Sequence, residues 1–309
     1  MSAGWVAAGV RARGLARRRL GRDGARDLAA SDSLAAALGT LANTPYGREV
    51  KTGMDLASAE HAVFATLLWH MRILAGWGPP LGSGPLRLLA TGFEVANVTG
   101  RLAGIGGQNA ASPYALGSMA TAWPAISEAR TPAEVRGALA ASSWGDPGGE
   151  DLATVRLALV LGWARRVLDG VPGAADWAIS GSALVLCRVL MADALSALGP
   201  AAVRDAHHLL GSGWQEASSP GELARHVPRA AAKVLEAASG PDDLWRAEAL
   251  WWSNLEVSGA ALAARSTLDV SSSVGVVGLL AVDAWRTRAA LEVAARGGGG
   301  MVELFDAMA

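Results

Sequence analysis

Leu152-Ala-Thr-Val-Arg-Leu-Ala-Leu-Val-Leu-Gly-Trp-Ala-Arg-Arg-Val-Leu168 is the stretch that decides the fold class. Its apolar residues recur at three- and four-residue spacing, which places one face of a helix against a core. That face carries Leu152, Val155, Leu159, Trp163 and Val167. Residues 245–264 repeat the pattern, and alternation of the strand type is nearly absent from the chain. The sequence therefore predicts an all-α protein.

Clusters of glycine and proline mark the expected breaks between helices. They fall at residues 76–85, 104–113, 146–149, 170–173 and 239–242. Two helix starts share one design, because Thr131-Pro132-Ala133-Glu134 and Ser219-Pro220-Gly221-Glu222 each offer a capping hydroxyl, a first-turn proline and a glutamate at the third position. Ser31-Asp32-Ser33-Leu34 looks like a degenerate first copy without the glutamate. The three copies begin at residues 31, 131 and 219, so they lie 100 and 88 residues apart.

Two further landmarks recur at similar intervals. One is an acidic residue embedded in an otherwise apolar helix, at Glu94, Asp193 and Asp283. The other is a helix that runs into an aromatic-glycine turn, because Leu41-Ala-Asn-Thr-Pro-Tyr-Gly47 is echoed by Leu139-Ala-Ala-Ser-Ser-Trp-Gly145. We therefore expect three diverged helical repeats, with boundaries at residues 1–107, 108–200 and 201–309.

Composition sets limits on location and partners. The 309 residues carry a formal net charge of -1, which provides no global attraction to nucleic acid. A single cysteine, Cys187, cannot form an internal disulfide and favours a reducing cytoplasm. We expect no secretory leader and no transmembrane helix, because no apolar run approaches the roughly 20 residues that span a bilayer.

The N-terminal segment allows two interpretations. It combines Trp5 with a run of arginines, namely Arg11, Arg13, Arg17, Arg18, Arg19, Arg22 and Arg26. An ordinary terminal helix is the commoner explanation. The alternative is an interfacial anchor, because indole and guanidinium groups both suit a lipid headgroup region.

The titratable residues form no catalytic or metal-binding pattern. The five histidines do not occur at the spacing of a zinc site. Gly104-Ile-Gly-Gly-Gln108 follows no expected strand and lacks the phosphate-loop pattern. Asp242-Asp243 has no third acid at magnesium-site spacing. We expect no catalytic residue, cofactor, metal or small-molecule substrate.

The recurring acids Glu94, Asp193 and Asp283 also allow two interpretations. They occupy solvated faces of amphipathic helices, or they are buried against arginines such as Arg101, Arg188 and Arg286. The first arrangement is the commoner one in proteins. Either way, equivalent positions in separate repeats do not form an acid–base pair.

Several motifs resemble the family of central-stalk connectors of V-type and archaeal A-type rotary ATPases. Residues 5–13 are similar to its opening helix, and Thr44-Pro-Tyr-Gly47 is the most specific match. Residues 86–97 resemble its acidic helix, and residues 277–288 resemble its closing helix. The matching or interface positions are Arg11, Arg13, Pro45, Tyr46, Gly47, Glu94, Asn97, Asp283, Arg286 and Arg288.

The resemblance implies a specific role. In that family three helical domains form a funnel that seats on the membrane rotor ring and receives the tip of the central stalk. The chain would then be a non-catalytic component of the complex, peripheral on the cytoplasmic face of the membrane, with the stalk proteins and the rotor ring as partners. Two alternatives remain, an unrelated helical-repeat adaptor that binds a partner protein and a helical enzyme.

Overall fold

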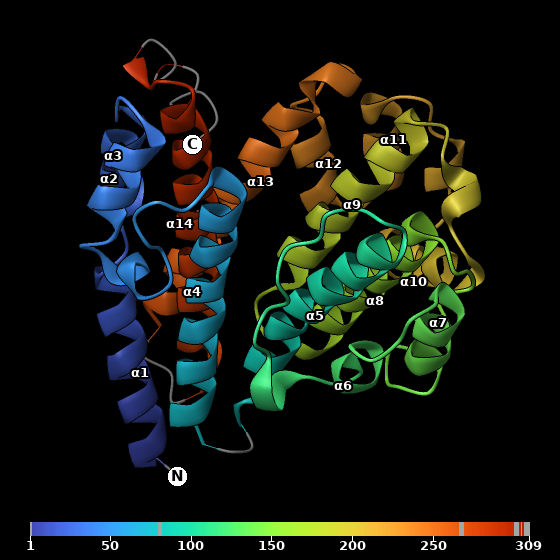
Figure 1. The fold of residues 1–309 in the computed structure, drawn as a ribbon. Coiled ribbons are helices and arrows are strands. Elements are labelled where there is room, and N and C mark those ends of the chain that lie inside the picture. Colours follow the sequence, from blue (N-terminus) through green and yellow to red (C-terminus); the bar gives the residue numbers. More distant parts are fainter. Residues whose placement is uncertain (1, 80–81, 266–268, 300–302, 304, 306–309) are drawn as a thin grey trace. The chain divides into compact units, whose positions relative to one another are not determined.

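The computed structural model describes residues 2–79, 82–265, 269–299, 303 and 305 (Figure 1). Every regular element within these residues is a helix, which confirms the predicted all-α class. The chain divides into two compact units: unit 1 comprises residues 1–86 and 252–309, and unit 2 comprises residues 87–251. The limits fall inside helices α5 (Gly84–Ile105) and α13 (Leu244–Ala263). The three repeats and their funnel-like array stay predictions.

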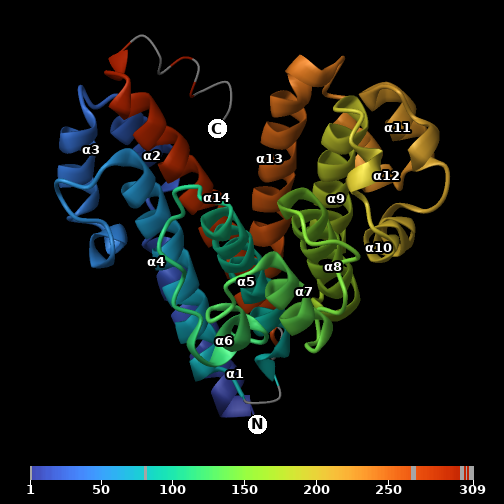
Figure 2. The same ribbon diagram turned by 45° about the vertical axis from the view of Figure 1, so that its right-hand side comes forward.

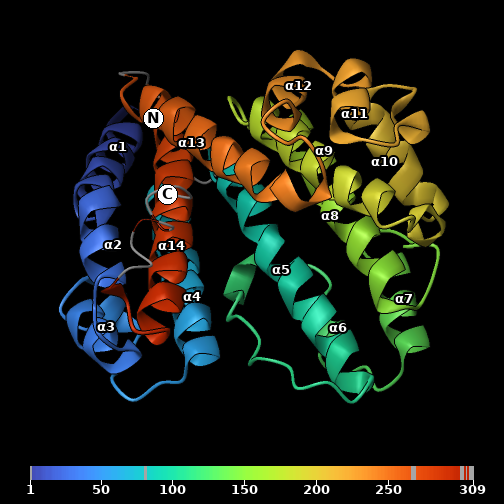
Figure 3. The same cartoon turned by 90° about the horizontal axis from the view of Figure 1, so that it is seen from above.

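Unit 1 is built around one long helix, α14 (Ser271–Ala295), which is buried on nearly every side. Such a helix is apolar all round, which explains the uninterrupted apolar run from Val274 to Leu280. Figures 1 and 3 show its neighbours around it. They are α1 (Ser2–Arg17), α2 (Gly21–Ala29), α3 (Leu34–Leu41) and α4 (Leu56–Trp77).

Glycine permits a close approach between α14 and the unit 1 part of α13. A Cβ added at Gly275 would overlap the Gly259 carbonyl oxygen and the Ala263 nitrogen. A Cβ added at Gly259 would in turn lie 3.1 Å from the carbonyl oxygen of Gly275. The two backbones therefore touch at a point where Gly275 has no room for a side chain and a side chain at Gly259 would be crowded.

Unit 2 contains a second set of packed helices (Figure 2). Helix α8 packs against α9 and α10, and α9 packs against α12. The part of its core between α5 and α8 is filled by residues such as Val98, Ile126, Leu139 and Val155. The helices are α6 (Trp123–Ile126), α7 (Pro132–Ala140), α8 (Leu152–Gly170), α9 (Ala175–Met191), α10 (Pro200–Leu210), α11 (Pro220–His226) and α12 (Arg229–Leu235). Short 3-10 turns of this unit are η3 (Gly117–Met119), η4 (Leu195–Ala197), η5 (Trp214–Glu216) and η6 (Pro241–Asp243).

One packing arrangement occurs twice in unit 2. The indole of Trp163 donates to the Leu88 carbonyl at 2.9 Å, and its ring lies over Gly92, four residues further along α5. The indole of Trp251 donates to the Trp177 carbonyl at 3.1 Å, and its ring lies over Gly181, four residues further along α9. The recurrence at matching positions is what a sequence repeat would produce.

The predicted helix starts are confirmed. Thr131 Oγ1 accepts from the backbone N–H of Glu134 at 3.2 Å, and Glu134 accepts from the N–H of Arg130 at 2.6 Å. Ser219 and Glu222 form the same capping bond at the start of α11, where Glu222 accepts from the N–H of Ser218. The degenerate first copy begins two residues later than predicted, because Ser33 and not Ser31 caps α3, through the N–H of Ala36 at 3.3 Å.

The predicted breaks also agree with the structure. Each of the five glycine- and proline-rich stretches lies between helices and overlaps a helix end by no more than two residues. Trp5 in α1 packs against Gly82, where a Cβ would overlap its indole ring. This contact ties the terminal helix to unit 1.

Candidate functional site

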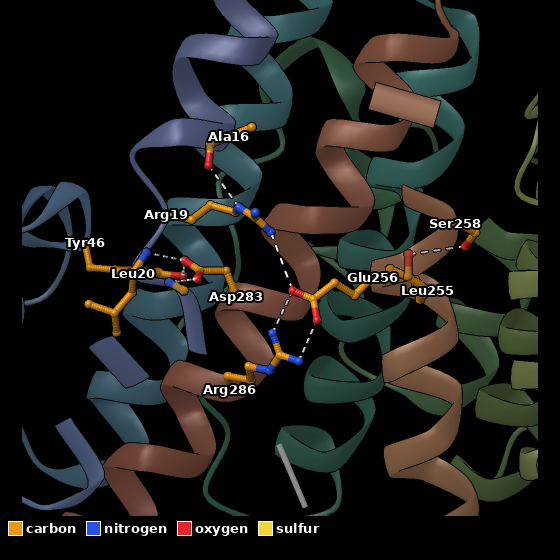
Figure 4. A network of polar contacts seen from close by, with 10 residues as sticks. Ala16, Arg19, Leu20, Tyr46, Leu255, Glu256, Ser258, Asp283 and Arg286 are labelled. Atoms are coloured by element: carbon orange, nitrogen blue, oxygen red, sulfur yellow. Dashed lines mark hydrogen bonds and ion pairs between the residues drawn. The ribbon is translucent and has the colours of Figure 1, made fainter. Parts of the chain in front are cut away.

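Asp283 is a buried acid in the middle of α14, and the residue is only 3% exposed. Its carboxylate oxygens accept the backbone N–H groups of Leu20 at 3.1 Å and Gly21 at 2.7 Å, at the start of α2 (Figure 4). The hydroxyl of Tyr46 donates to it at 2.8 Å. A helix N-terminus favours negative charge, so these donors stabilise the carboxylate. We call Asp283, Leu20, Gly21 and Tyr46 the Asp283 node.

The turn that presents Tyr46 is set by its local sequence. Thr44 Oγ1 donates to the Leu41 carbonyl at 2.7 Å and accepts the N–H of Tyr46 at 3.2 Å. Pro45 begins the 3-10 turn η1 (Pro45–Arg48), where its missing N–H has no cost. Gly47 lies so close to the Ala42 carbonyl that a Cβ there would overlap it. Each residue of Thr44-Pro-Tyr-Gly47 thus has a structural task.

Tyr46 is held as a hydrogen-bond donor. Burial raises its pKa well above the ordinary value of 10, and the negative charge of Asp283 raises it further. The phenol therefore stays protonated at physiological pH and keeps donating to Asp283.

Unit 2 contains a second node of the same design around Glu94 of α5, which is fully buried. Its Oε1 accepts the backbone N–H groups of Thr121 at 2.8 Å, Ala122 at 2.8 Å and Trp123 at 2.7 Å, at the start of α6. Its Oε2 accepts the Thr121 hydroxyl and the indole N–H of Trp144, the latter at 2.9 Å. We call these residues the Glu94 node.

The two nodes correspond to the echoed aromatic-glycine turns. In unit 2, Ser142 Oγ donates to the Leu139 carbonyl at 2.7 Å and accepts the N–H of Trp144 at 3.1 Å. These are the bonds that Thr44 makes to Leu41 and Tyr46 in unit 1. The two echoed turns therefore form the same hydrogen bonds, and each one directs an aromatic donor at a buried acid on a long helix.

Asp193, the middle acid of the predicted set, differs from Glu94 and Asp283. Asp193 is exposed and follows the end of α9 with a φ of 51°. In the matching helix register, Glu94 lies two residues after Gly92, and the residue two after Gly181 is Ala183. The expectation of an acid embedded in a helix at Asp193 is therefore wrong, and the predicted second repeat, residues 108–200, has no buried carboxylate at the matching position of α9.

The burial of the other two acids differs from both interpretations. Glu94 and Asp283 are not solvated, and they bind backbone N–H groups where arginines were the alternative. Arg101 donates to the Ala129 carbonyl, and Arg188 pairs with Glu248. A helix sequence does not reveal that the start of a distant helix will meet the acid.

The remaining predicted positions have separate surroundings. Arg286, 4% exposed, binds both oxygens of Glu256 at 2.8 and 2.7 Å (Figure 4). Arg288 pairs with Glu60 at 3.3 Å, and Arg13 is exposed. In unit 2, Asn97 exchanges two hydrogen bonds with the backbone of Tyr114, at 3.0 and 2.7 Å.

A cavity of about 320 Å³ lies in unit 1 beside the Asp283 node. Four of the predicted positions line it, namely Arg11, Pro45, Tyr46 and Asp283. The other lining residues are Leu15, Arg18, Arg19, Thr44, Arg48, Leu67, Trp69, His70, Ile73 and Leu280. We call this space the arginine cavity.

Sequence reasoning missed the second wall of the arginine cavity. Trp69 and His70 lie on α4, and the guanidinium of Arg48 stacks on the Trp69 ring at 4.3 Å from its centroid. Nothing in the local pattern links residue 48 to residue 69. The one available signal was a histidine on the apolar face of α4, beside Leu67 and Leu74.

Metal-binding clusters, reactive thiols and membrane-spanning helices can each be looked for in the described part of the chain. No group of three or more histidine, cysteine, aspartate or glutamate side chains there is placed to hold a metal ion. Burial raises the pKa of the Cys187 thiol to about 11, which keeps it protonated. Within the same residues, no helix has the length and apolar character that crossing a bilayer demands.

No protein-family model matches the chain, and no curated protein matches it.

Proposed function

We propose that the chain is a non-catalytic connector of a V-type or A-type rotary ATPase. It links the central stalk to the membrane rotor ring and transmits torque for proton or sodium transport. The observation that carries this proposal is the Asp283 node. Thr44-Pro-Tyr-Gly47 and Asp283, which support the resemblance to that family, meet there through the hydrogen bond from Tyr46 to Asp283, two residues 237 positions apart in the chain.

Stiffness supports the proposal, because a part that transmits torque must resist deformation. Both nodes fasten an aromatic turn and the start of a short helix to the side of a long helix through a buried carboxylate. Charge-assisted hydrogen bonds of this kind are shorter and stronger than neutral ones. Opening a whole node would leave its buried charge without these partners, which costs several kcal/mol by general estimates.

The commitment of both carboxylates to structure also favours a non-catalytic role. Asp283 accepts three hydrogen bonds and Glu94 accepts five. A general base needs a free lone pair directed at a substrate. These two acids use theirs on the backbone and on side-chain donors.

The proposed location is the cytoplasmic face of the membrane, where the chain is peripheral. The rotor ring presents polar loops there in the family that the sequence resembles. Arg13 on α1 is exposed and is a candidate contact for those loops. No role in nucleic-acid binding is proposed.

The test is affinity purification of the tagged full chain from mildly solubilised membranes of its own host, with mass spectrometry of the partners. Recovery of the stalk, ring and catalytic proteins together is the expected result. A folded chain that brings down none of them would overturn the connector and leave the adaptor. Turnover of a small molecule by the purified chain would instead favour the helical enzyme.

A pair of charge reversals sharpens the test. R13E reverses an exposed charge on α1, and K233E reverses an exposed charge on α12 in the other unit. We expect R13E to lower the recovery of ring proteins relative to stalk proteins, and K233E to leave that ratio unchanged. Equal effects of the two variants would remove α1 from the proposed ring contact.

A further inference from the structure

The arginine cavity gathers positive charge around a small space. Arg11, Arg18 and Arg19 reach it from the N-terminal segment, and Arg48 reaches it from η1. Among the described residues that line the cavity, Asp283 is the only carboxylate. Four guanidinium groups therefore share the lining with one acid.

Two of these arginines have all or most of their donors available. Arg11 stacks on Trp77 with 4.4 Å to the ring centroid, and stacking occupies the face of a guanidinium but not its N–H groups. The side chain of Arg18 makes no hydrogen bond or ion pair with the residues that the structure describes. Both can therefore bind a ligand in the cavity without giving up a hydrogen bond.

The other two arginines are partly engaged. Arg19 donates from Nε to the Ala16 carbonyl at 2.9 Å and forms a long ion pair of 3.9 Å with Glu256 (Figure 4). Arg48 pairs through Nε with Glu49 at 3.1 Å. Because a guanidinium has five N–H donors, each of these side chains keeps donors for a further partner.

His70 provides an independent indication of a ligand. The residue is only 6% exposed and lines the cavity, yet its ring nitrogens form no hydrogen bond within the described residues. Its nitrogens are not among the fully buried atoms that lack a partner, so they are open to the space of the cavity, where water or a ligand completes their hydrogen bonds. The ring is thus placed to bind something inside the cavity.

The carboxylate of Asp283 is bound to other donors and not to the arginines that line the cavity. Its oxygens accept donors from Leu20, Gly21 and Tyr46, which are outside the set of arginines. The guanidinium N–H donors that are not bound to Ala16, Glu49 or Glu256 are therefore left for another anion.

We propose that the arginine cavity binds the phosphate group of a small phosphate ester. A phosphate monoester carries close to two negative charges at neutral pH and offers three terminal oxygens. Guanidinium groups arriving from separate elements fit that geometry better than the two coplanar oxygens of a carboxylate. This function is additional to the connector role and does not depend on it.

The remaining lining indicates the rest of the ligand. Leu15, Leu67, Ile73 and Leu280 form an apolar wall with the ring of Trp69. The cavity of about 320 Å³ lies at the small end of the range of ligand sites, about 300–1,000 Å³. A phosphate with a small apolar body therefore fits both walls.

The probe is phenyl phosphate, titrated calorimetrically into the full chain at neutral pH and low salt. We expect saturable binding at one site, with inorganic phosphate binding more weakly and phenol not binding. Loss of one charged hydrogen-bond partner in R18A should weaken phenyl phosphate binding by about tenfold or more. Absence of saturable binding by the folded wild-type chain would overturn the proposal.

Arg17 provides the matched control, because it is exposed, adjacent in sequence and does not line the cavity. R17A removes the same charge from the same segment and should leave the dissociation constant within about twofold of wild type, which is the size of a screened long-range effect. Equal losses in R17A and R18A would show a general surface field and would overturn the site. Circular dichroism of both variants checks that each remains folded.

The pKa of His70 provides a second measurement. It changes if an anion binds in the cavity, and it does not change if the arginines serve the structure alone. Burial and the charges of Arg18 and Arg48 lower the pKa of His70 to about 4. A bound dianion offsets the two arginines, so phenyl phosphate should raise the pKa of His70 measured by NMR. Asp283, Arg11 and Arg19 also line the cavity. They are present in both the free and the phosphate-bound protein, so they do not account for a difference in pKa between the two. A His70 pKa that does not move at saturation would contradict phosphate binding in this cavity.

Vesicles distinguish the two sources of such a phosphate. If R18A weakens binding to vesicles of phosphatidylcholine with phosphatidic acid, and phenyl phosphate competes, the phosphate belongs to a lipid headgroup. If phenyl phosphate binds and the vesicles do not, a soluble ester is the ligand. Vesicle binding that ignores both R18A and phenyl phosphate would count against the site.

Discussion

Gly47 has its Cα against the carbonyl of Ala42, so even a methyl group has no room there. We predict that G47A destabilises unit 1 by about 1–3 kcal/mol, the usual cost of overpacking. Chemical denaturation followed by circular dichroism measures the loss.

Gly39 provides the control for this substitution. It lies inside α3, and a Cβ added there would meet nothing within 4 Å. G39A should raise stability by about 0.5–1 kcal/mol, because alanine favours a helix over glycine. If G47A were as benign as G39A, the tight turn would not be what fixes Tyr46.

His70 makes the stability of unit 1 depend on pH. Its pKa is about 4 in the folded protein, lowered by burial and by Arg18 and Arg48, and about 6.5 in an unfolded chain. Between these values the unfolded chain takes up a proton that the folded chain does not. Stability is therefore complete above pH 6.5 and falls as the pH drops towards 4, by on the order of 3 kcal/mol.

The measurement is urea unfolding of wild type and H70Q across that range. Glutamine does not titrate, so H70Q should lose less stability than wild type between about pH 7 and pH 4. Parallel pH profiles for the two proteins would refute the buried neutral histidine.

For single residues, the sequence indicates which side chains are notable more readily than it indicates their hydrogen-bond partners. Tyr46, Gly47, Glu94 and Asp283 all stand out, because their pattern recurs or matches a family. The burial of the two acids cannot be seen in the sequence, because their hydrogen-bond donors come from residues up to 263 positions away. His70 escapes notice for the same reason, because its neighbours in the cavity come from other elements.

At the scale of helices, the contact between α13 and α14 depends on two glycines. We predict that G275A forces these backbones apart and destabilises unit 1 by about 1–3 kcal/mol, because its Cβ would overlap main-chain atoms that cannot rotate away. Thermal unfolding followed by circular dichroism measures the effect.

Gly14 is the matched control in the same unit. It lies within α1, and a Cβ added there would meet nothing within 4 Å. G14A should be neutral or slightly stabilising. A G275A protein with the thermal stability of G14A would show that the helices can separate at little cost.

Helix starts and breaks can be predicted well, because capping boxes and glycine-proline clusters act within a few residues. The role of α14 as the core helix of unit 1 cannot be predicted in this way. Its apolar run indicates burial, but the surrounding of one helix by α1, α2, α3 and α4 is a property of tertiary packing. The first cap is displaced by two residues because Ser31 and Ser33 are chemically equivalent, and only the backbone distinguishes them.

At the scale of the whole molecule, the two nodes should act locally. We predict that D283N accelerates hydrogen exchange at the amides of Leu20 and Gly21 by about tenfold or more, because the neutral amide loses the charge that those N–H groups bind. E94Q should do the same at Thr121, Ala122 and Trp123. Exchange measured by NMR or mass spectrometry separates the two sets.

Each variant is the control of the other, since each removes one carboxylate charge from one unit. D283N should leave the Glu94 node protected, and E94Q should leave the Asp283 node protected. Loss of protection in both units from either change would show that the units do not open independently.

The all-α class follows directly from the periodicity, whereas the grouping of helices does not. Unit 1 joins residues 1–86 with residues 252–309, which no contiguous division of the chain describes. Sequence similarity identifies the repeated turns and acids, whereas tertiary packing decides which turn meets which acid. The acid that serves the first aromatic turn lies near the other end of the chain.

The Asp283 node has a consequence for how the protein is made. Synthesis proceeds from the N-terminus, so α1 to α4 leave the ribosome long before α14, which supplies their common core. Unit 2 is contiguous and is complete at residue 251, while the first four helices still wait with apolar faces uncovered. We therefore expect chaperones to bind these helices during that interval. A nascent chain that stops before Asp283 lacks the acid that binds Leu20, Gly21 and Tyr46, so unit 1 stays open until α14 has been made.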